Sequence, residues 1–179
     1  MRVKLWGTRG SVPAPGSRTA RYGGNTSCAQ VTLGDGTTIV LDAGTGIRPL
    51  GLALDASRGP IHILLTHLHV DHIQGLLFFA PLFERDADVT VWGPPSSRSL
   101  ESRIGRYLSA PLAPVEVREL PAGPAFRACP APEWTIGSRL RKAPPPLVAV
   151  NTSPIDGSDT AAATTSPSTS AAIDTDQRG

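Results

Sequence analysis

Three of the four histidines of this chain lie within six consecutive positions, together with an aspartate, in the sequence THLHVDH at residues 66 to 72. Imidazole nitrogens and carboxylate oxygens are ligands that zinc, iron and manganese take in proteins. His67 and His69, two apart on an extended loop, leave the backbone on the same side, and Asp71 and His72 point elsewhere once a helix begins. Two metal ions held about 3.5 to 4 Å apart can share a bridging hydroxide that attacks an ester. The cluster therefore predicts hydrolase chemistry.

The crowding itself favours a metal site, because packing several imidazoles together is unfavourable unless a metal compensates. A lone histidine beside an apolar run is more often a core or cap residue, and we interpret His62 in that way. The sequence IHILLT at 61 to 66 predicts a buried strand, and the apolar run at 73 to 83 predicts a buried helix that begins near His72. The cluster is therefore expected on a strand-to-helix loop.

Strand patterns dominate the N-terminal part of the chain. Apolar and charged residues alternate in MRVKLWG, which predicts a short strand that leads into a glycine-rich loop. In CAQVTLGDGTTIVLDAG, apolar arms flank Asp35-Gly36, a dipeptide typical of a type I′ hairpin in which both turn residues have positive φ. Two antiparallel strands are expected here.

Helices and strands alternate in the rest of the patterned sequence. Helices are predicted over 47–57 and 97–110, and strands over 88–93 and 114–120. An antiparallel start followed by this alternation predicts a layered, mixed α/β fold.

Composition limits the partners of the protein. The chain has 179 residues, 40% of them hydrophobic, and a net charge of +2, which fits one domain and predicts neither a strong nucleic-acid-binding patch nor a membrane surface partner. We interpret Arg98, Arg103 and Arg106 as the solvated face of a helix. No apolar run approaches the roughly 20 residues of a membrane span. Cys28 and Cys129 are far apart without a metal-type spacing, which favours a reduced, cytoplasmic location.

The character of the sequence changes near residue 128. Residues 1–127 are expected to form the domain, 128–150 are rich in proline and expected to be irregular, and 151–179 consist mainly of Ser, Thr, Ala and Asp. Such a composition cannot bury a core, so we expect a disordered tail over 151–179.

The sequence THLHVDH resembles the T-H-x-H-x-D-H signature of the metallo-β-lactamase superfamily. Three further blocks resemble its branch of ribonuclease Z-like and cyclic phosphodiester hydrolases: GTRGS at 7–11, YGGNTSC at 22–28 and LDAGTGIRPLG at 41–51. The resemblance implies an αββα sandwich, of which residues 1–127 would form the N-terminal half and part of the second. It also implies two divalent metal ions, zinc with manganese or iron as alternatives, and a small-molecule or nucleotide phosphodiester substrate of the cyclic nucleotide or RNA type, hydrolysed through a metal-bound hydroxide.

The resemblance assigns roles to individual residues. His67 and His69 would bind the first metal, and Asp71 and His72 the second. Asp71 would also be catalytic, by positioning or deprotonating the attacking water. Asp42 would support from behind the loop that carries these four ligands, residues 66–72, which we call the ligand loop. A simple Asx turn is the alternative for Asp42.

The loop that contains Asn25, Thr26 and Ser27 resembles a segment close to the metals, where small polar side chains can face substrate. A glycine-permitted turn is the alternative for each of the three. Arg9 has two interpretations as well, a contact to a substrate phosphate and an ordinary exposed loop arginine.

The family completes its site with a histidine, a bridging aspartate and a final histidine from the second half of the fold. This chain has no histidine after His72, and its last four aspartates lie in the Ser- and Thr-rich tail. A reading-frame change or misassigned gene end near residues 126–129 is our main hypothesis, and ligands from another subunit are the alternative. The chain would then be a hydrolase by family or an inactive metal-binding fragment. A half sandwich would expose an apolar sheet face, which predicts self-association.

Overall fold

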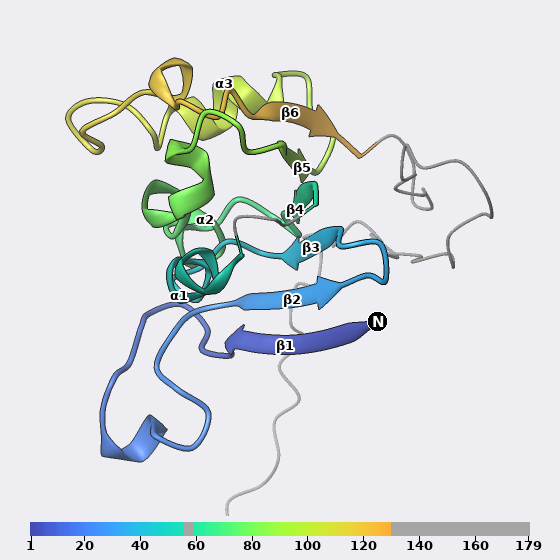
Figure 1. The fold of residues 1–179 in the computed structure, drawn as a ribbon. Coiled ribbons are helices and arrows are strands. Elements are labelled where there is room, and N and C mark those ends of the chain that lie inside the picture. The colour runs from blue at the N-terminus through green and yellow to red at the C-terminus, as the bar shows by residue number, and fades with distance from the viewer. Residues whose placement is uncertain (56–58, 130–179) are drawn as a thin grey trace, which may run out of the picture.

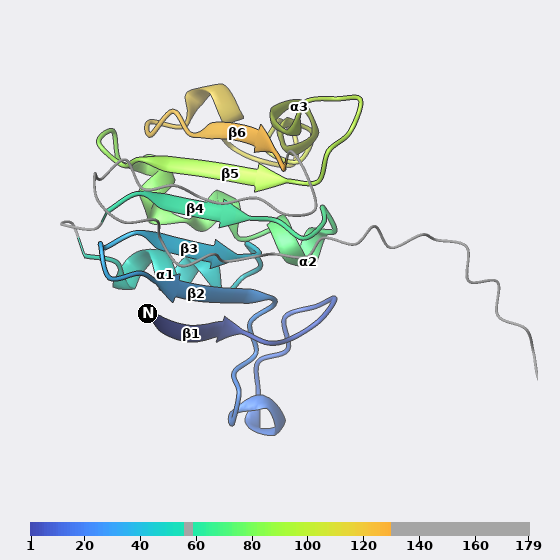
Figure 2. The ribbon, with the colours of Figure 1, turned by 90° about the vertical axis from the view of Figure 1, so that its right-hand side faces the viewer.

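The computed structural model describes residues 1–55 and 59–129. Its centre is a six-stranded sheet whose spatial order is the order along the chain (Figure 2). The first three strands pair in antiparallel fashion and the last four pair in parallel. The strands are β1 (Arg2–Gly7), β2 (Cys28–Thr32), β3 (Thr38–Leu41), β4 (Ile61–Leu64), β5 (Val89–Gly93) and β6 (Ala125–Ala128).

The connections between the parallel strands carry the helices. These are α1 (Ile47–Ala53), α2 (Val70–Ile73) and α3 (Leu100–Gly105), with the short 3-10 turns η2 (Leu76–Phe78), η3 (Ala80–Phe83) and η4 (Val117–Glu119). A further 3-10 turn, η1 (Ser17–Thr19), lies between the antiparallel strands β1 and β2. The three α-helices lie on one face of the sheet (Figure 1). The predicted mixed α/β class is confirmed. Among the described residues, no helix has the length and apolar character needed to cross a membrane.

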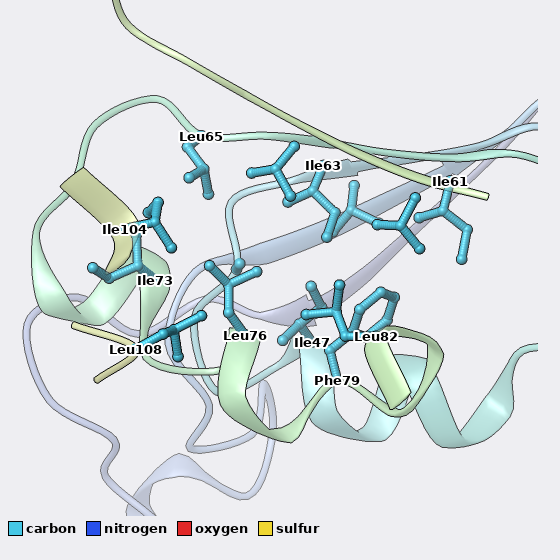
Figure 3. Packing of buried hydrophobic residues seen from close by; sticks show 14 of the residues in the cluster. Ile47, Ile61, Ile63, Leu65, Ile73, Leu76, Phe79, Leu82, Ile104 and Leu108 are labelled. Atoms are coloured by element: carbon cyan, nitrogen blue, oxygen red, sulfur yellow. The ribbon is translucent and has the colours of Figure 1, made fainter. Parts of the chain in front are cut away.

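The main core lies between the sheet and this helical layer. Figure 3 shows Ile61 and Ile63 of β4 pointing toward side chains of the helical layer, among them Leu76 and Phe79. All four of these side chains are at most 1% exposed. Burying one such side chain stabilises a fold by about 1.5 to 3 kcal/mol. The packing of the helical layer on the sheet therefore holds in place the loops that follow the strands.

The other face of the sheet carries a second set of apolar side chains. The strand register aligns Leu5, Ala29, Leu41, Leu64 and Trp92 in one row across the first five strands. Val31, Ile39 and Leu64 form a small buried cluster on this face. Ala128, the first residue of the segment predicted to be irregular at 128–150, belongs to β6. The rest of that segment after Cys129 and the predicted tail over 151–179 lie outside the described residues.

The β2–β3 hairpin forms as predicted, but its turn type was predicted wrongly. Gly36 has a φ of 87° and Asp35 does not have a positive φ, so the turn is not type I′. Leu33 N donates to Thr37 O at 2.9 Å, which closes a three-residue loop. Such loops combine a type I turn with one left-handed residue, so only Gly36 needs the conformation that glycine favours.

The apolar run at 73–83 is also not the continuous helix that was predicted. The α-helix begins earlier, at Val70, and ends at Ile73, and the rest forms the 3-10 turns η2 and η3. Pro81 cannot donate the hydrogen bond that a longer helix needs. A Cβ atom at Gly75 would collide with the carbonyl oxygens of Gly44 and Ala43. The chain therefore turns where a loop packs directly against it.

The predicted strand at 114–120 is wrong. Residues 117–119 form η4, with Glu116 and Glu119 making a reciprocal capping box, and the sixth strand lies later, at Ala125–Ala128. Alternation in PVEVREL is typical of strands, but the local capping hydrogen bonds offer the backbone a competing arrangement. The predicted helix at 97–110 is present over the shorter span of α3.

Candidate metal centre

The histidine cluster lies where two parallel strands end. Asp42 follows β3 directly, and the segment from Leu65 to the start of α2 follows β4. The carboxyl ends of parallel strands meet at one edge of a sheet, which is where α/β folds place their sites. Figure 2 shows this edge at the arrowheads of β3 and β4, beside α2.

Asp42 joins these two segments through its carboxylate. Oδ1 accepts the Thr66 N–H at 2.9 Å and the Thr66 hydroxyl at 2.8 Å. Oδ2 accepts the Ser27 hydroxyl at 3.1 Å and lies 2.8 Å from Nδ1 of His72. The Asp42 side chain is 8% exposed, so these contacts replace water as its partners. The Asp42 carboxylate thus bonds to the segment that follows β4.

The groups that face Nδ1 of two histidines favour one tautomer of each ring. The single hydroxyl proton of Thr66 goes to Asp42, so Thr66 Oγ1 can only accept from Nδ1 of His67, 3.0 Å away. His72 Nδ1 lies 2.8 Å from Asp42 Oδ2, a close contact without the alignment of a hydrogen bond, and the carboxylate favours a proton on that nitrogen. Both rings are left with the Nε2 lone pair for a ligand, the arrangement in which a supporting group orients a metal-binding histidine.

Asp71 is held from the other side by the loop after β1. Ser11 N donates to Asp71 Oδ2 at 2.7 Å across 60 residues of sequence. This hydrogen bond is the main cause of the lowered pKa of Asp71, to which nearby His72 and His67 also contribute. Asp71 Oδ2 lies 3.4 Å from His72 Nε2. The carboxylate is thus placed beside the ring nitrogen that is available to a ligand.

The three imidazoles of the cluster lie against one another. The ring centroids of His67 and His72 are 4.0 Å apart, and those of His67 and His69 are 4.5 Å apart. Burial lowers the pKa of His67, and the neighbouring histidines lower it further. A neutral ring is the form that binds a metal.

The imidazole and carboxylate groups of this cluster are of the types that bind a divalent ion, and hydrogen bonds from neighbouring groups support them. Within residues 1–55 and 59–129, however, no three His, Cys, Asp or Glu side chains converge closely enough to hold an ion. The described residues therefore fit part of a metal site.

The loop at residues 25–27 forms hydrogen bonds with the segments on both sides of the histidine cluster. Thr26 is fully buried, and its Oγ1 accepts from the Thr45 N–H at 2.8 Å and from Gln74 Nε2 at 3.2 Å. Thr45 Oγ1 in turn donates to Asn25 Oδ1 at 3.1 Å. Ser27 donates to Asp42. These side chains thus connect, through hydrogen bonds, the loops that surround the histidines.

Two further residues near the centre differ from ordinary surface residues. Arg9 is half-buried, and its Nε is buried with no hydrogen-bond partner among the described residues, so it is not a simple exposed arginine. Cys28 is 1% exposed, and burial together with the charge of Asp42 raises the pKa of its thiol to about 12. This thiol remains protonated and packs as part of the core.

Sequence reasoning missed Ser11, Thr45 and Gln74, and it assigned no role to Thr66. Thr66 belongs to the signature, so its position was a usable signal. Ser11 contributes its backbone N–H and Gln74 follows the cluster, and neither residue type indicates such a contact.

Comparison with known proteins identifies the family. A family model described as a beta-lactamase superfamily domain matches residues 37–156, which is more than half of the chain. The chain belongs to the metallo-β-lactamase superfamily. Its likeness to ribonuclease Z is also clear, with 32% identity over 133 residues to the ribonuclease Z of Haloferax volcanii and over 127 residues to that of Haloarcula marismortui.

These matches cover 72% and 69% of this chain, but it spans only 39% and 38% of the length of the two relatives. The crystal structure of unliganded yeast PDE1 superposes with a TM-score of 0.51 at 14% identity, over 76% of this chain and 52% of that one, which supports the fold. The metallo-β-lactamase superfamily comprises hydrolases that bind divalent metals.

Proposed function

We propose that this chain acts as a metal-dependent hydrolase of phosphodiester bonds of the ribonuclease Z-like kind, with RNA or a cyclic nucleotide as substrate. The observation that carries the proposal is the support of the ligand loop by Asp42, which holds Thr66 and the His72 ring in place. Such support is needed for metal-binding histidines and has no evident use in an ordinary turn. Likeness to ribonuclease Z supports the choice of a phosphodiester.

The ligand roles follow the sequence prediction. His67 and His69 would hold one ion, and Asp71 and His72 the other. Divalent ions, with zinc as our proposal, supply Lewis-acid chemistry that lowers the pKa of water and neutralises charge on phosphoryl oxygens. Asp71, kept ionised by the Ser11 N–H, would position the attacking water or accept its proton. Thr66, held by Asp42, faces Nδ1 of His67, and the Asp42 carboxylate itself faces Nδ1 of His72, so Nε2 of each ring would stay available.

Metal content and turnover test this function together. We expect the purified chain to bind zinc or manganese and to hydrolyse a generic bis-aryl phosphodiester. The His69→Ala variant should lose turnover, and His62→Ala should keep it, because His62 lies on a strand away from the ligand loop. Bound metal without turnover would contradict the enzyme and favour the second candidate.

That second candidate is a metal-binding fragment without activity. It is favoured by a specific observation: no three donors converge among the described residues. Substoichiometric metal and no turnover are its expected results.

Two further parts of the proposal concern the cellular location of the protein and its association with other copies. We propose a reducing, cytoplasmic location, since Cys28 and Cys129 are both free thiols. We also propose self-association through the outer sheet face, supported by the exposed Val3 and Leu5 at its edge, which are 57% and 65% exposed.

A further inference from the structure

The segment between β1 and β2, residues 8–27, leaves the sheet as a long excursion below β1 (Figures 1 and 2). We call this segment the arm. It contains Arg9, Arg18 and Arg21 and no acidic residue, and the first acidic residue of the chain is Asp35. The net charge of +2 hides this distribution, because acidic residues are confined to the rest of the chain. The arm is therefore a concentrated cationic element.

The arm has a defined conformation. The Thr19 hydroxyl donates to Ala14 O at 2.6 Å, and Ala14 N donates to Gly24 O at 2.9 Å. Gly23 N donates to Thr19 O at 2.8 Å. These bonds fix the backbone before any ligand binds, which reduces the ordering cost of binding.

Exposed cations and an exposed ring meet at the end of the arm. Arg18 and Arg21 are exposed, and the Tyr22 side chain is 63% exposed. The guanidinium carbon of Arg21 lies 5.0 Å from the Tyr22 ring centroid. A guanidinium that binds phosphate beside a ring on which a base stacks is the combination that binds single-stranded nucleic acid.

The base of the arm leads to the candidate metal centre. Ser11 of the arm bonds to Asp71, and Arg9 N donates to Asn25 O at 2.9 Å. The buried Nε of Arg9 has no partner in the described part of the chain. Arg9 is only half-buried, so the exposed part of its guanidinium group is open to a phosphate oxygen. Cationic groups thus lie at both ends of the arm, and its base touches the ligand loop.

We propose that the arm binds a single-stranded polynucleotide and leads it to the metal centre. Arg18 and Arg21 contact phosphates, Tyr22 stacks on a base, and Arg9 binds a phosphate close to the ligand loop. This inference rests on the proposed function and specifies its substrate class, a single-stranded RNA rather than a small cyclic nucleotide.

Binding of a fluorescein-labelled oligouridylate to the full chain, measured by fluorescence anisotropy, tests the arm. The double variant R18Q/R21Q should bind on the order of tenfold more weakly near 0.1 M salt, and the slope of log affinity against log salt should fall by about 1.4, because two phosphate contacts are lost. The matched control is R98Q/R106Q, which removes the same charge at α3, beside the opposite edge of the sheet (Figure 2). The control should bind like the wild type.

A second pair of variants tests stacking. Tyr22→Ala should weaken binding roughly fivefold to a hundredfold, and Tyr22→Phe should retain the wild-type affinity because it keeps the ring face. Equal losses in both double variants, no loss in R18Q/R21Q, or tighter binding to anionic phosphatidylserine vesicles than to RNA would overturn the proposal.

The same titration with chelator present separates the arm from the catalytic proposal. Arm-dependent RNA binding that persists without metal supports the arm even if the metal-loaded chain shows no turnover. Turnover of a small phosphodiester by a chain that binds no RNA would support the proposed hydrolase and overturn the arm.

Discussion

Two residues with unusual backbone conformations stand at the candidate metal centre. Ser11 and Asp42 have φ values of 60° and 59°, and they are the non-glycine residues with positive φ in the described part of the chain. This conformation costs on the order of 1 to 3 kcal/mol and persists only where the surroundings determine it. Each of the two bonds to the ligand loop, Ser11 through its N–H and Asp42 through its carboxylate. The two residues with strained φ values are therefore the ones whose hydrogen bonds position the loop that carries the histidines.

Substitution of Ser11 separates its conformation from its hydrogen bond. Ser11→Gly keeps the N–H donor and relieves the strained φ, so the free energy of unfolding should change by less than about 1 kcal/mol. Ser11→Pro fixes φ near −65° and removes the donor, so it should cost roughly 3 kcal/mol or more. Urea denaturation of the two variants checks this. Similar stabilities for both variants would contradict a structural role of the Ser11 N–H.

Asp42→Asn tests the support of the ligand loop. The substitution removes the negative charge 2.8 Å from His72 Nδ1, so metal affinity should fall about 10- to 100-fold. Metal competition with a chromophoric chelator measures this. Ser27→Ala is the matched control, since it removes one donor to the same carboxylate and leaves the His72 contact in place. An unchanged affinity in Asp42→Asn would show that the carboxylate serves only as a turn residue.

At the residue scale, the sequence singled out the histidine cluster and Asp42 as candidates, because both lie in short contiguous motifs. It did not predict the Ser11–Asp71 contact, which joins residues 60 positions apart through a backbone donor. Backbone donors look alike in every residue, so only the three-dimensional arrangement reveals such a partner.

At the scale of elements, strands with buried Ile and Val residues were predicted well, because their side chains alone determine the pattern. The segment at 114–120 shows the limit. Its alternation fits a strand, but Glu116 and Glu119 cap a 3-10 turn, and local hydrogen bonds outweigh a pattern of only seven residues. The long helix expected at 73–83 failed for a tertiary reason, since Gly75 packs directly on the backbone of residues 43 and 44.

The pairing of β4 with β5 should depend on pH through His62. Trp92 Nε1 donates to His62 Nδ1 at 3.3 Å, and burial lowers the pKa of His62, although nearby Asp88 raises it in part. The unfolded state, with a histidine pKa near 6.5, then binds more protons than the folded state below that pH. The free energy of unfolding should therefore fall as the pH drops below about 6.5.

Urea denaturation at a series of pH values measures this linkage. His62→Gln keeps an acceptor for Trp92 and does not titrate, so its stability should fall less than that of the wild type on acidification. The difference between the two curves isolates His62, because every other titratable group is present in both proteins. Parallel curves would refute the linkage.

At the scale of the whole molecule, net charge and composition were poor guides to the distribution of charge. The first 34 residues carry five basic side chains and no acidic one. The prediction that no strong nucleic-acid-binding patch exists rested on the overall balance. Alternation of strands and helices was a better guide, because each parallel crossover requires a helix that covers the sheet.

The outer sheet face leads to the last prediction. All three α-helices cover the opposite face (Figure 1), and the row from Leu5 to Trp92 follows the register across five strands. Leu5 is 65% exposed on β1, at the edge of the sheet. If this face mediates self-association, Leu5→Lys places a charge into the contact and should shift the protein toward monomer.

Sedimentation velocity over a concentration series checks this shift. Leu52→Lys is the matched control, because Leu52 is 67% exposed and lies on α1, on the opposite face of the sheet. It adds the same charge and removes an equally exposed leucine, so it should leave the association unchanged. Equal dissociation in both variants would point to a general effect of charge, and a wild type that sediments as a monomer at all concentrations would contradict self-association itself.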